Sequence, residues 1–372
     1  MRGSRCWLRR YVDKKCDDLA GSASLIDPVK NHASPNPKAV RYNFWLQLFI
    51  RTFPFDTSQH RSPEDVLHHI MIEDTAEKIR SMEIRGAGLI ARAAAAALRD
   101  FVLTLDVSSL DEFDSALKKA ADTLLRTRPT AVSLSNAVRM VARYRSEDLE
   151  SARREVVANA ERFIESSLKA VERIGEIGSR RVRDGDVILT HCNSSAALAV
   201  IERAHRDGKR IEVIATESRP RYQGHLTIKR LDEVGIPTEL IVDSAVRSVI
   251  EDVDLVVVGA DVVTANGSLV NKIGTSQIAL CAHEARKPFM AAAETYKFSP
   301  DTLMGELVEI EERGPEEVLD DYMRYKHLRV RNPAFDVTPH QYIDVICTEV
   351  GAIPPEMSYI IIKEWLGWEI RA

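Results

Sequence analysis

The sequence has little of what several large classes of protein require. Its five cysteines are scattered over 372 residues, and none stands in a metal-ligand spacing such as C-x-x-C. No apolar run approaches the roughly 20 residues that span a bilayer. The formal net charge of −5 leaves no electrostatic footprint for nucleic acid. We therefore expect no metal site, no membrane association and no nucleic-acid partner.

The remaining composition is that of an ordinary globular protein. Apolar residues make up 45% and charged residues 29% of the chain, which is long enough for two domains with separate cores. An odd number of cysteines without a signal peptide indicates a reducing compartment. We accordingly expect a cytoplasmic protein.

The first half of the sequence falls into two stretches of different character. Residues 1–61 mix paired basic residues with turn formers and have no sustained helical or strand period, so we expect a poorly ordered extension without chemistry. The alternative is that they lie upstream of the native product, with synthesis starting at Met71. Residues 62–183 begin with a helix-start motif (Ser-Pro-Glu-Asp) and continue with helical apolar periods. They predict a helical N-terminal domain.

From residue 184 onward, short apolar runs alternate with segments of helical character. The runs are 187–189, 211–215, 240–242, 255–258 and 289–292. Repeated strand–helix units predict a parallel sheet with right-handed crossovers, and Asn266-Gly267 predicts a hairpin. The predicted fold class is therefore α/β, an N-terminal helical domain followed by a Rossmann-like catalytic domain at 184–372. No G-x-G-x-x-G follows the first strand, so we expect no dinucleotide cofactor.

The stretch 184–195 predicts a strand, a tight polar turn and the start of a helix. In open α/β sheets, ligands bind at the carboxyl ends of the strands, where this turn would lie. Cys192 stands in the turn between polar neighbours, and the N–H groups of the helix start would lower its pKa and favour the thiolate. A small buried cysteine is the alternative, but the polar neighbours favour a reactive thiol.

Further polar residues follow other predicted strands at the same edge of the sheet. Asp261 comes just after the run at 255–258, although an ordinary turn aspartate is the alternative. Asn271 and Lys272 open another helix, and Lys297 follows the run at 289–292. We expect these four side chains to converge with Cys192 on one rim.

The helical part contributes cations. Arg85-Gly86-Ala87-Gly88 precedes a strongly helix-forming run at 89–98, so backbone N–H groups and a forked donor could cradle a phosphate there. A plain helix–helix turn is the alternative. Arg126 and Arg128 add two cations at another helix end. One thiol, one carboxylate and several cations suit proton transfer on a phosphorylated sugar.

Taken together, these motifs make residues 71–372 similar to a known family. The chain resembles the initiation factor 2B regulatory subunits and their isomerase relatives, and within that family it looks most like the archaeal-type isomerases of ribose 1,5-bisphosphate. The segments that carry the resemblance are 82–88 (MEIRGAG), 128–134 (RPTAVSL), 190–192 (THC), 217–220 (ESRP), 259–261 (GAD), 271–275 (NKIGT), 294–298 (ETYKF) and 332–339 (NPAFDVTP).

The resemblance implies an aldose–ketose isomerase that converts ribose 1,5-bisphosphate to ribulose 1,5-bisphosphate in the salvage of nucleotide-derived ribose, with no cofactor. It implies that Cys192 and Asp261 are the catalytic pair. Asp261 would open the ring and must start protonated, which a dry site would favour, and Cys192 would move a proton between C2 and C1. It also implies homo-oligomers, dimers assembled into a hexamer, with AMP as an activator. The substrate contacts implied are Arg85, Gly86, Ala87, Gly88, Arg128, Ser194, Asn271, Lys272 and Lys297.

One departure from the family pattern bears on the substrate. The isomerases read His-Cys-His-Ser-Lys, whereas this chain reads His-Cys-Asn-Ser-Ser at 191–195 and so lacks one lysine for a phosphate. Its Cys-Asn pair is similar to the methylthioribose-1-phosphate isomerases, which form the first rival. The second rival is a non-catalytic regulatory subunit of a translation factor. The presence of both Cys192 and Asp261 argues against that second rival.

Overall fold

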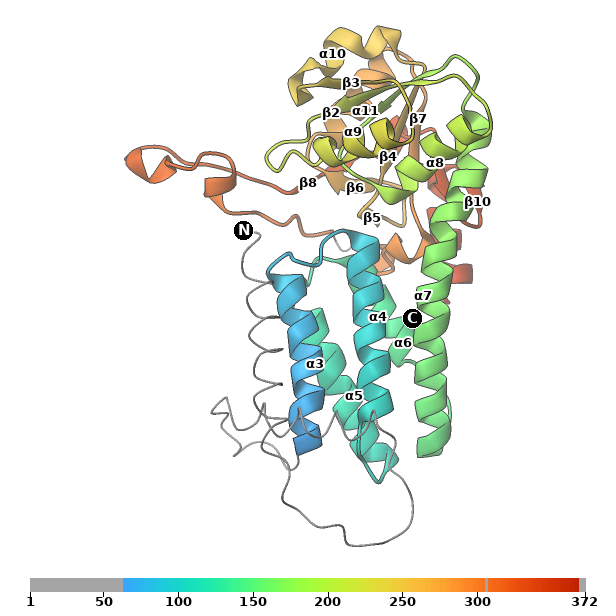
Figure 1. The fold of residues 1–372 in the computed structure, drawn as a ribbon, viewed down its shortest axis with the longest axis vertical. Helices are drawn as coiled ribbons and strands as arrows, with labels where there is room; N and C mark the ends of the chain where they lie inside the picture. Colours follow the sequence, from blue (N-terminus) through green and yellow to red (C-terminus); the bar gives the residue numbers. More distant parts are fainter. Residues whose placement is uncertain (1–62, 305–306, 368–372) are drawn as a thin grey trace, which may run out of the picture. The chain divides into compact units, whose positions relative to one another are not determined.

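Helices occupy most of the chain from residue 63 to residue 178 in the computed structural model, which describes residues 63–304 and 307–367. The expected extension at 1–61 lies outside the described residues. Figure 1 shows these helices lying side by side below the sheet. They are α3 (Pro63–Arg80), α4 (Ala87–Thr104), α5 (Leu110–Leu125), α6 (Val132–Ala142) and α7 (Leu149–Gly178).

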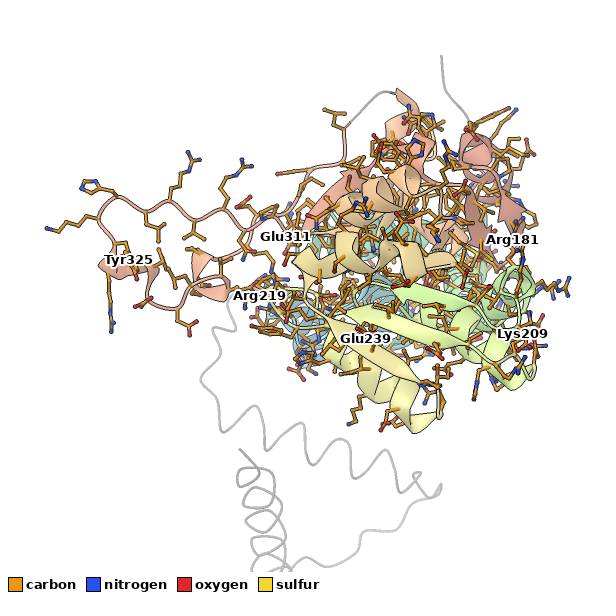
Figure 2. The ribbon with its side chains drawn as sticks, turned by 90° about the horizontal axis from the view of Figure 1, so that it is seen from above. Arg181, Lys209, Arg219, Glu239, Glu311 and Tyr325 are labelled. Atoms are coloured by element: carbon orange, nitrogen blue, oxygen red, sulfur yellow. The ribbon has the colours of Figure 1, made fainter. Side chains whose placement is uncertain are left out.

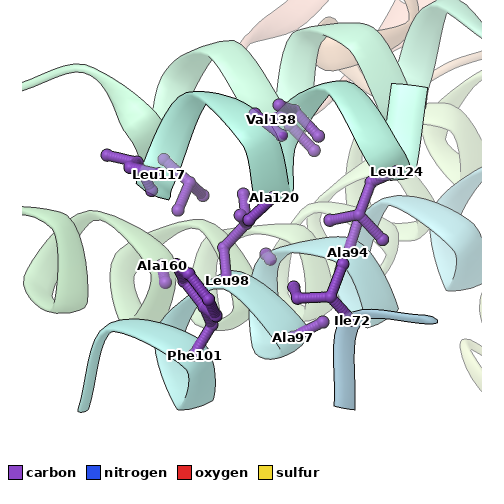
Figure 3. Close-up of a cluster of buried hydrophobic side chains, with 14 of the residues drawn as sticks. Ile72, Ala94, Ala97, Leu98, Phe101, Leu117, Ala120, Leu124, Val138 and Ala160 are labelled. Carbon is purple, nitrogen blue, oxygen red and sulfur yellow. The ribbon is translucent and has the colours of Figure 1, made fainter. Parts of the chain in front are cut away.

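The alanine-rich sequence of α4 explains how these helices pack. Small side chains let the neighbouring helices approach closely, and eight residues of α4 are buried. Figure 3 shows the resulting core, where α4 meets α5, α6 and α7. Its labelled side chains are Ile72, Ala94, Ala97, Leu98, Phe101, Leu117, Ala120, Leu124, Val138 and Ala160.

A seven-stranded sheet follows, in the order β10-β9-β7-β4-β1-β2-β3. All neighbouring pairs are parallel except β10 with β9. The strands are β1 (Val187–Thr190), β2 (Glu212–Thr216), β3 (Thr238–Ile241), β4 (Leu255–Gly259), β7 (Phe289–Ala292), β9 (Val345–Thr348) and β10 (Gly351–Ile353).

Both faces of this sheet are covered. Residues of α8 (Ser195–Arg206) and α9 (Gly224–Glu233) join one buried apolar cluster. Residues of α10 (Val246–Val249) and α11 (Thr275–Glu284) join the cluster on the other side. The central strand β4 is buried along its whole length, as its run of valines requires. The α/β fold class, helical part first and Rossmann-like parallel sheet second, is confirmed.

The expected hairpin at Asn266-Gly267 is also present. It joins β5 (Val262–Val263) to β6 (Leu269–Lys272), which pair antiparallel, and the Thr264 N–H donates to the Ser268 carbonyl at 2.9 Å. A third strand, β8 (Phe335–Thr338), completes this small sheet. The chain passes from β4 into this small sheet, in which Lys272 is the last residue of β6.

The C-terminal quarter of the chain holds features that the sequence did not predict. Strands β8, β9 and β10 were not expected. A projecting segment at 314–332 leaves the body and returns, with Tyr325 toward its outer end (Figure 2). Its two ends meet where the Arg313 N–H donates to the Asn332 carbonyl at 2.9 Å.

The described helical and sheet parts belong to one compact unit, Ser62–Ala372. The assignment of 62–183 and 184–372 as separate domains stays a prediction. Among the helices that the structure describes, none is both long and apolar enough to cross a membrane.

Candidate active site

The strand order places two sequence-predicted residues at one point of the sheet. The chain runs from β1 outward to β2 and β3, then returns to β4 on the other side of β1. Such a reversal opens a crevice at the carboxyl ends of the two central strands. Cys192 lies two residues beyond the end of β1, and Asp261 two residues beyond the end of β4. The thiol and the carboxyl therefore lie at the topological switch point.

A cavity of about 320 Å³ lies between this sheet edge and the helical part. Every site residue expected from the sequence lines it: Arg85, Gly86, Ala87, Gly88, Arg128, Cys192, Ser194, Asp261, Asn271, Lys272 and Lys297. The sequence did not predict four further charged lining residues, Arg92, Arg221, Glu309 and Arg313. Residues of the sheet edge and of the helical part thus line one cavity, as the sequence predicted.

The Cys192 backbone adopts a conformation that few residues tolerate. Its φ is 67°, in the left-handed region, which is strained for a residue with a side chain. Two hydroxyl groups hold it there. The Cys192 N–H donates to Ser218 Oγ at 2.8 Å, and Thr227 Oγ1 donates to the Cys192 carbonyl at 2.7 Å. Both peptide groups of the cysteine are thereby fixed from the segment after β2.

The thiol itself differs from the expectation. The sequence predicted a lowered pKa, but burial raises the pKa of Cys192 to about 11. The Lys272 charge and the Asn193 N–H lower that pKa, and the Asp261 charge raises it. The prediction was wrong because the helix-start N–H groups act in a site that removes water from the thiol. Desolvation of the thiolate outweighs their attraction.

His191, next to the cysteine, is a neutral link rather than a titrating group. Its Nε2 lies 2.9 Å from the Ile273 carbonyl, so Nε2 carries the proton. Its Nδ1 then accepts a hydrogen bond from Thr216 Oγ1 at 2.6 Å. Burial lowers the pKa of His191, which keeps the ring neutral. The ring thereby joins the Cys192 turn to the residue after Lys272.

Asp261 has the electrostatic surroundings that the expected role requires. Burial is the largest influence and raises its pKa. Lys297, Lys272 and Arg128 lower that pKa in decreasing order, and Glu294 raises it. The net direction favours the protonated form, as expected from the sequence. The Asp261 backbone is fixed by its N–H, which donates to the Val270 carbonyl at 3.0 Å.

Lys297 is held by a carboxylate that the sequence analysis did not identify. Lys297 lies in the 3-10 turn Thr295–Lys297 after β7, and its Nζ is 2.6 Å from Oε2 of the buried Glu294. Helix α6 fixes this turn, because Asn136 Nδ2 donates to the carbonyls of Tyr296 and Phe298 at 2.8 and 2.9 Å. Lys297 thus enters the pocket on a rigid support.

The helical wall is built from the start of α4 and the loop before α6. Gly86 caps α4 with a φ of 89°, a conformation that a side chain would strain. Arg85 beside it is exposed to the pocket mouth. Arg128 forms an ion pair with Glu311, labelled in Figure 2 near the base of the projecting segment. The two predicted phosphate contacts on this wall therefore differ, since Arg128 already has a carboxylate partner.

Ser194 begins α8 at the pocket. Its Oγ accepts a hydrogen bond from the Ala197 N–H at 3.3 Å and so caps the helix. It can approach β4 only because Gly259 lacks a side chain: a Cβ there would lie 2.2 Å from Ser194 Oγ. The close contact holds the start of α8 next to Asp261, the second residue after Gly259.

Positive charge dominates the pocket lining. Arg85, Arg92, Arg128, Arg221, Lys272, Lys297 and Arg313 line it, against the two carboxyl groups of Asp261 and Glu309. Arg221 and Arg313 both pair with Glu317, at 2.6 and 3.3 Å. Within residues 63–304 and 307–367, Arg85 and Lys272 have no carboxylate partner. Such a lining fits an anionic ligand with more than one charged group.

Some of the lining residues that the sequence analysis missed could have been found from the sequence, and others could not. Arg92 lies four residues after Gly88 on α4 and so faces the same side of that helix, which could have revealed it. Glu309 and Arg313 lie in a loop without a periodic pattern and gave no signal. In the described part of the chain, no group of three or more His, Cys, Asp or Glu side chains is placed to hold a metal ion.

The fold and the site define an α/β protein with a pocket at a switch point, lined mainly by cations and containing a thiol and a carboxyl group. The sequence pattern of the Initiation factor 2 subunit family matches residues 83–355, and the chain belongs to that family.

This chain is similar to curated relatives with two different named activities. A protein from Archaeoglobus fulgidus named ribose 1,5-bisphosphate isomerase is 61% identical over 295 residues, 79% of this chain and 93% of that relative. One of the same name from Methanocaldococcus jannaschii is 56% identical, over 80% of this chain and 96% of its own length. A methylthioribose-1-phosphate isomerase from Geotalea uraniireducens is 39% identical, over 76% of this chain and 86% of that relative.

Solved structures of this family share the fold. The Pyrococcus horikoshii protein described as translation initiation factor eIF-2B superposes with a TM-score of 0.67 at 32% identity. The match covers 76% of this chain and 97% of that one. The architecture is therefore common to proteins described as enzymes and as translation factors, so the pocket residues must decide between these functions.

Proposed function

We propose that this protein is an isomerase that converts ribose 1,5-bisphosphate to ribulose 1,5-bisphosphate. The observation that carries the proposal is the pocket lining: a thiol and a carboxyl group at the switch point, with cations on both walls. A bisphosphate carries up to four negative charges, and leaving one of its phosphates unpaired in a closed site would cost several kcal/mol. Relatives at 61% and 56% identity bear the name of this activity.

The two phosphates would occupy opposite walls. On the helical wall, Arg85 and the amides of residues 86–88 would hold one phosphate at the start of α4. On the sheet wall, Lys297 would hold the other, with Ser194 and the N–H groups that begin α8. Those groups would take the place of the lysine that family members carry where this chain has Ser195. Asn271, Lys272 and Arg128 would contact the sugar and its phosphates between these ends.

Ring opening would be the first chemical step. The phosphate on C1 prevents spontaneous opening, so the ring oxygen must receive a proton as its bond to C1 breaks. Asp261 would donate that proton, and its raised pKa supports a neutral carboxyl group at the start of turnover. The carboxylate left behind can later accept the proton of the C2 hydroxyl.

Transfer of a proton from C2 to C1 would follow. The thiolate form of Cys192, a small fraction at neutral pH because burial raises its pKa to about 11, would remove the C2 proton to give an enediolate-type intermediate and then deliver the proton to C1. The C2 hydroxyl proton would return to Asp261, so both groups end in their starting states. The proton balance closes with these two side chains. Lys272 and the Asn193 N–H, which both lower the pKa of Cys192, would support the thiolate.

A side-by-side assay of two sugar phosphates tests this proposal. We expect kcat/KM for ribose 1,5-bisphosphate to exceed that for methylthioribose 1-phosphate, because the second phosphate supplies binding energy that organises the site. Faster turnover of methylthioribose 1-phosphate would replace the proposed substrate with that of the first rival. Absence of turnover with either sugar would favour the regulatory subunit instead.

Regulation and assembly are part of the same proposal. We expect a homo-oligomer built from dimers, up to a hexamer, acting in the salvage of ribose from nucleotides with AMP as activator. Light scattering of the purified protein measures the first expectation. The initial rate with and without AMP measures the second.

A further inference from the structure

The turn after β7 holds a buried ion pair of which one partner lies outside the pocket. Glu294 and Lys297 are 1% and 6% exposed. Glu294 Oε2 lies 2.6 Å from Lys297 Nζ, and Glu294 Oε1 accepts a hydrogen bond from the Tyr296 hydroxyl at 3.0 Å. Lys297 lines the cavity, whereas Glu294 does not. The glutamate can therefore act on a bound substrate only through other residues.

The helical part fixes the position of this glutamate. Ser167 in α7 donates to the Tyr296 hydroxyl at 3.1 Å, and Arg92 in α4 donates to Ser167 Oγ at 3.1 Å. A hydrogen-bonded chain thus runs from the pocket residue Arg92 to the carboxylate of Glu294. Such a buried and connected network rigidifies the groups that it joins.

The charges of Lys297 and Glu294 both act on the pKa of Asp261. Among the charged groups around Asp261, Lys297 lowers the pKa of that carboxyl the most, and Glu294 raises it. Burial raises the pKa of Glu294, but Lys297 and Tyr296 together lower that pKa by more than burial raises it. Glu294 is therefore an anion. The Lys297 ammonium, which lines the same cavity as Asp261, is therefore paired with one fixed negative charge.

We propose that Glu294 is a further positioning residue of this site, which holds the Lys297 ammonium and offsets its charge next to Asp261. The inference rests on the proposed function, because it concerns the acid that opens the sugar ring. An ammonium without a counter-ion would favour the carboxylate form of Asp261 and so remove the proton needed for ring opening. With Glu294 in place, the pocket can keep a cation for a phosphate beside a neutral acid.

Other groups face Asp261 and set the background for this effect. Lys272 and Arg128 lower its pKa, and the Cys192 thiol interacts with it. Arg128 is paired with Glu311, whereas Lys272 has no carboxylate partner among the described residues. On the other side of Glu294, the carboxyl of Glu349 accepts hydrogen bonds from the Thr295 N–H and hydroxyl. Glu349 thus offers a control, because it is a half-buried glutamate in contact with the same turn.

The test is an infrared titration of the Asp261 carboxyl group in the full-length protein. The C=O band of the protonated acid is followed against pH and assigned by its loss in Asp261→Asn. In Glu294→Gln, which keeps the shape and removes the charge, we expect the titration midpoint to fall by about one pH unit or more, a tenfold change in acid dissociation. In Glu349→Gln we expect the midpoint to stay at the wild-type value.

A double variant separates charge from folding effects. Glu294→Gln with Lys297→Met removes both charges, and we expect its midpoint to return toward the wild-type value. Should Glu294→Gln alone fail to fold, Lys297→Met alone is expected to move the midpoint to higher pH. An unmoved midpoint in the folded Glu294→Gln protein, or in Lys297→Met where that variant must stand in, overturns the inference. An equal shift of the Asp261 midpoint in Glu349→Gln also overturns the inference.

Kinetics on the same samples provide a second readout. We expect Glu294→Gln to lower kcat increasingly as the pH rises, with no increase in KM, because Lys297 stays available to the phosphate. A merely structural role would lower activity equally at all pH values. If the wild-type protein does not turn over ribose 1,5-bisphosphate, the proposed function fails, while the infrared titration still decides whether Glu294 acts on Asp261.

Discussion

The two walls of the pocket are built in opposite ways. On the sheet wall, Lys272 and Lys297 are buried, and hydrogen bonds fix both peptide groups of Cys192. On the helical wall, Arg85 and Gly86 are exposed, and the Arg85 side chain has no hydrogen-bond or ion-pair partner in the described part of the chain. The wall that would carry the chemistry is ordered before substrate arrives. The helical wall, which would receive one of the two phosphates, leaves Arg85 free.

This difference predicts two kinds of kinetic defect. Groups held rigidly in a dry environment act on the transition state, because their positions and pKa values are set in advance. Free cations at the pocket mouth contribute mostly to binding. Substitutions of the proposed catalytic pair on the sheet wall should therefore lower kcat, and substitution of Arg85 on the helical wall should raise KM.

The largest effect is expected at the proposed catalytic pair. Cys192→Ser and Asp261→Asn should each lower kcat about 10²–10⁴-fold, the usual contribution of a positioned acid or base, with little change in KM. Steady-state kinetics with ribose 1,5-bisphosphate measure both constants. A variant that kept near-normal kcat would remove its residue from the mechanism.

A smaller effect of the opposite kind is expected at Arg85. Arg85→Ala should raise KM by about tenfold or more, since a charge-assisted phosphate contact is lost, while kcat falls less. Arg85→Lys keeps the charge without the forked geometry and should give an intermediate KM. A loss confined to kcat in Arg85→Ala would break the distinction between the walls.

The pH dependence of thiol reactivity sharpens the description of the sheet wall. With a pKa of about 11, Cys192 is almost entirely protonated at neutral pH. Only the thiolate is nucleophilic, so its alkylation by iodoacetamide should rise about tenfold per pH unit and level off near that value. Mass spectrometry of the peptide containing Cys192 follows this rate. A plateau of the alkylation rate below pH 9 would contradict the raised pKa and support the lowered pKa that the sequence predicted.

The smallest effect is expected at Thr227, whose hydroxyl contacts the backbone carbonyl of Cys192 and the side chain of Asn193. Thr227→Val removes the donor to the Cys192 carbonyl at similar volume, and the loss of one hydrogen bond should lower kcat about fivefold. Thr227→Ser keeps the hydroxyl and should retain most of the activity. Equal losses in both variants would show that packing, and not this hydrogen bond, supports the cysteine.

The parts of the molecule that were predictable from sequence are those with a local pattern. The apolar runs that became β1, β4 and β7, the Asn266-Gly267 hairpin and the alanine-rich α4 all express their structure within a few residues. The convergence of Cys192, Asp261 and Lys297 followed from one rule, since each comes after a strand of the seven-stranded sheet that ends at the same edge. Lys272 reaches the site differently, as the last residue of β6 in the small antiparallel sheet.

What could not be predicted depends on contacts between distant segments. The raised pKa of Cys192 depends on burial in a pocket that distant segments form together, which no local motif encodes. The pairing of Arg128 with Glu311 joins residues 183 positions apart. Glu294 lies in a motif used for the family resemblance, yet its partnership with Lys297 became visible only when the turn was seen as a buried 3-10 turn.

The central claim, proton transfer by a thiol on the sheet wall, is tested most directly with ribose 1,5-bisphosphate deuterated at C2. We expect wild-type protein to give a primary isotope effect on kcat and to form ribulose 1,5-bisphosphate that has lost part of its deuterium to water, because the label passes through Cys192. Cys192→Ser should abolish both turnover and exchange. Complete retention of deuterium at C1, with activity that survives the loss of Cys192, would indicate direct hydride transfer and contradict the account.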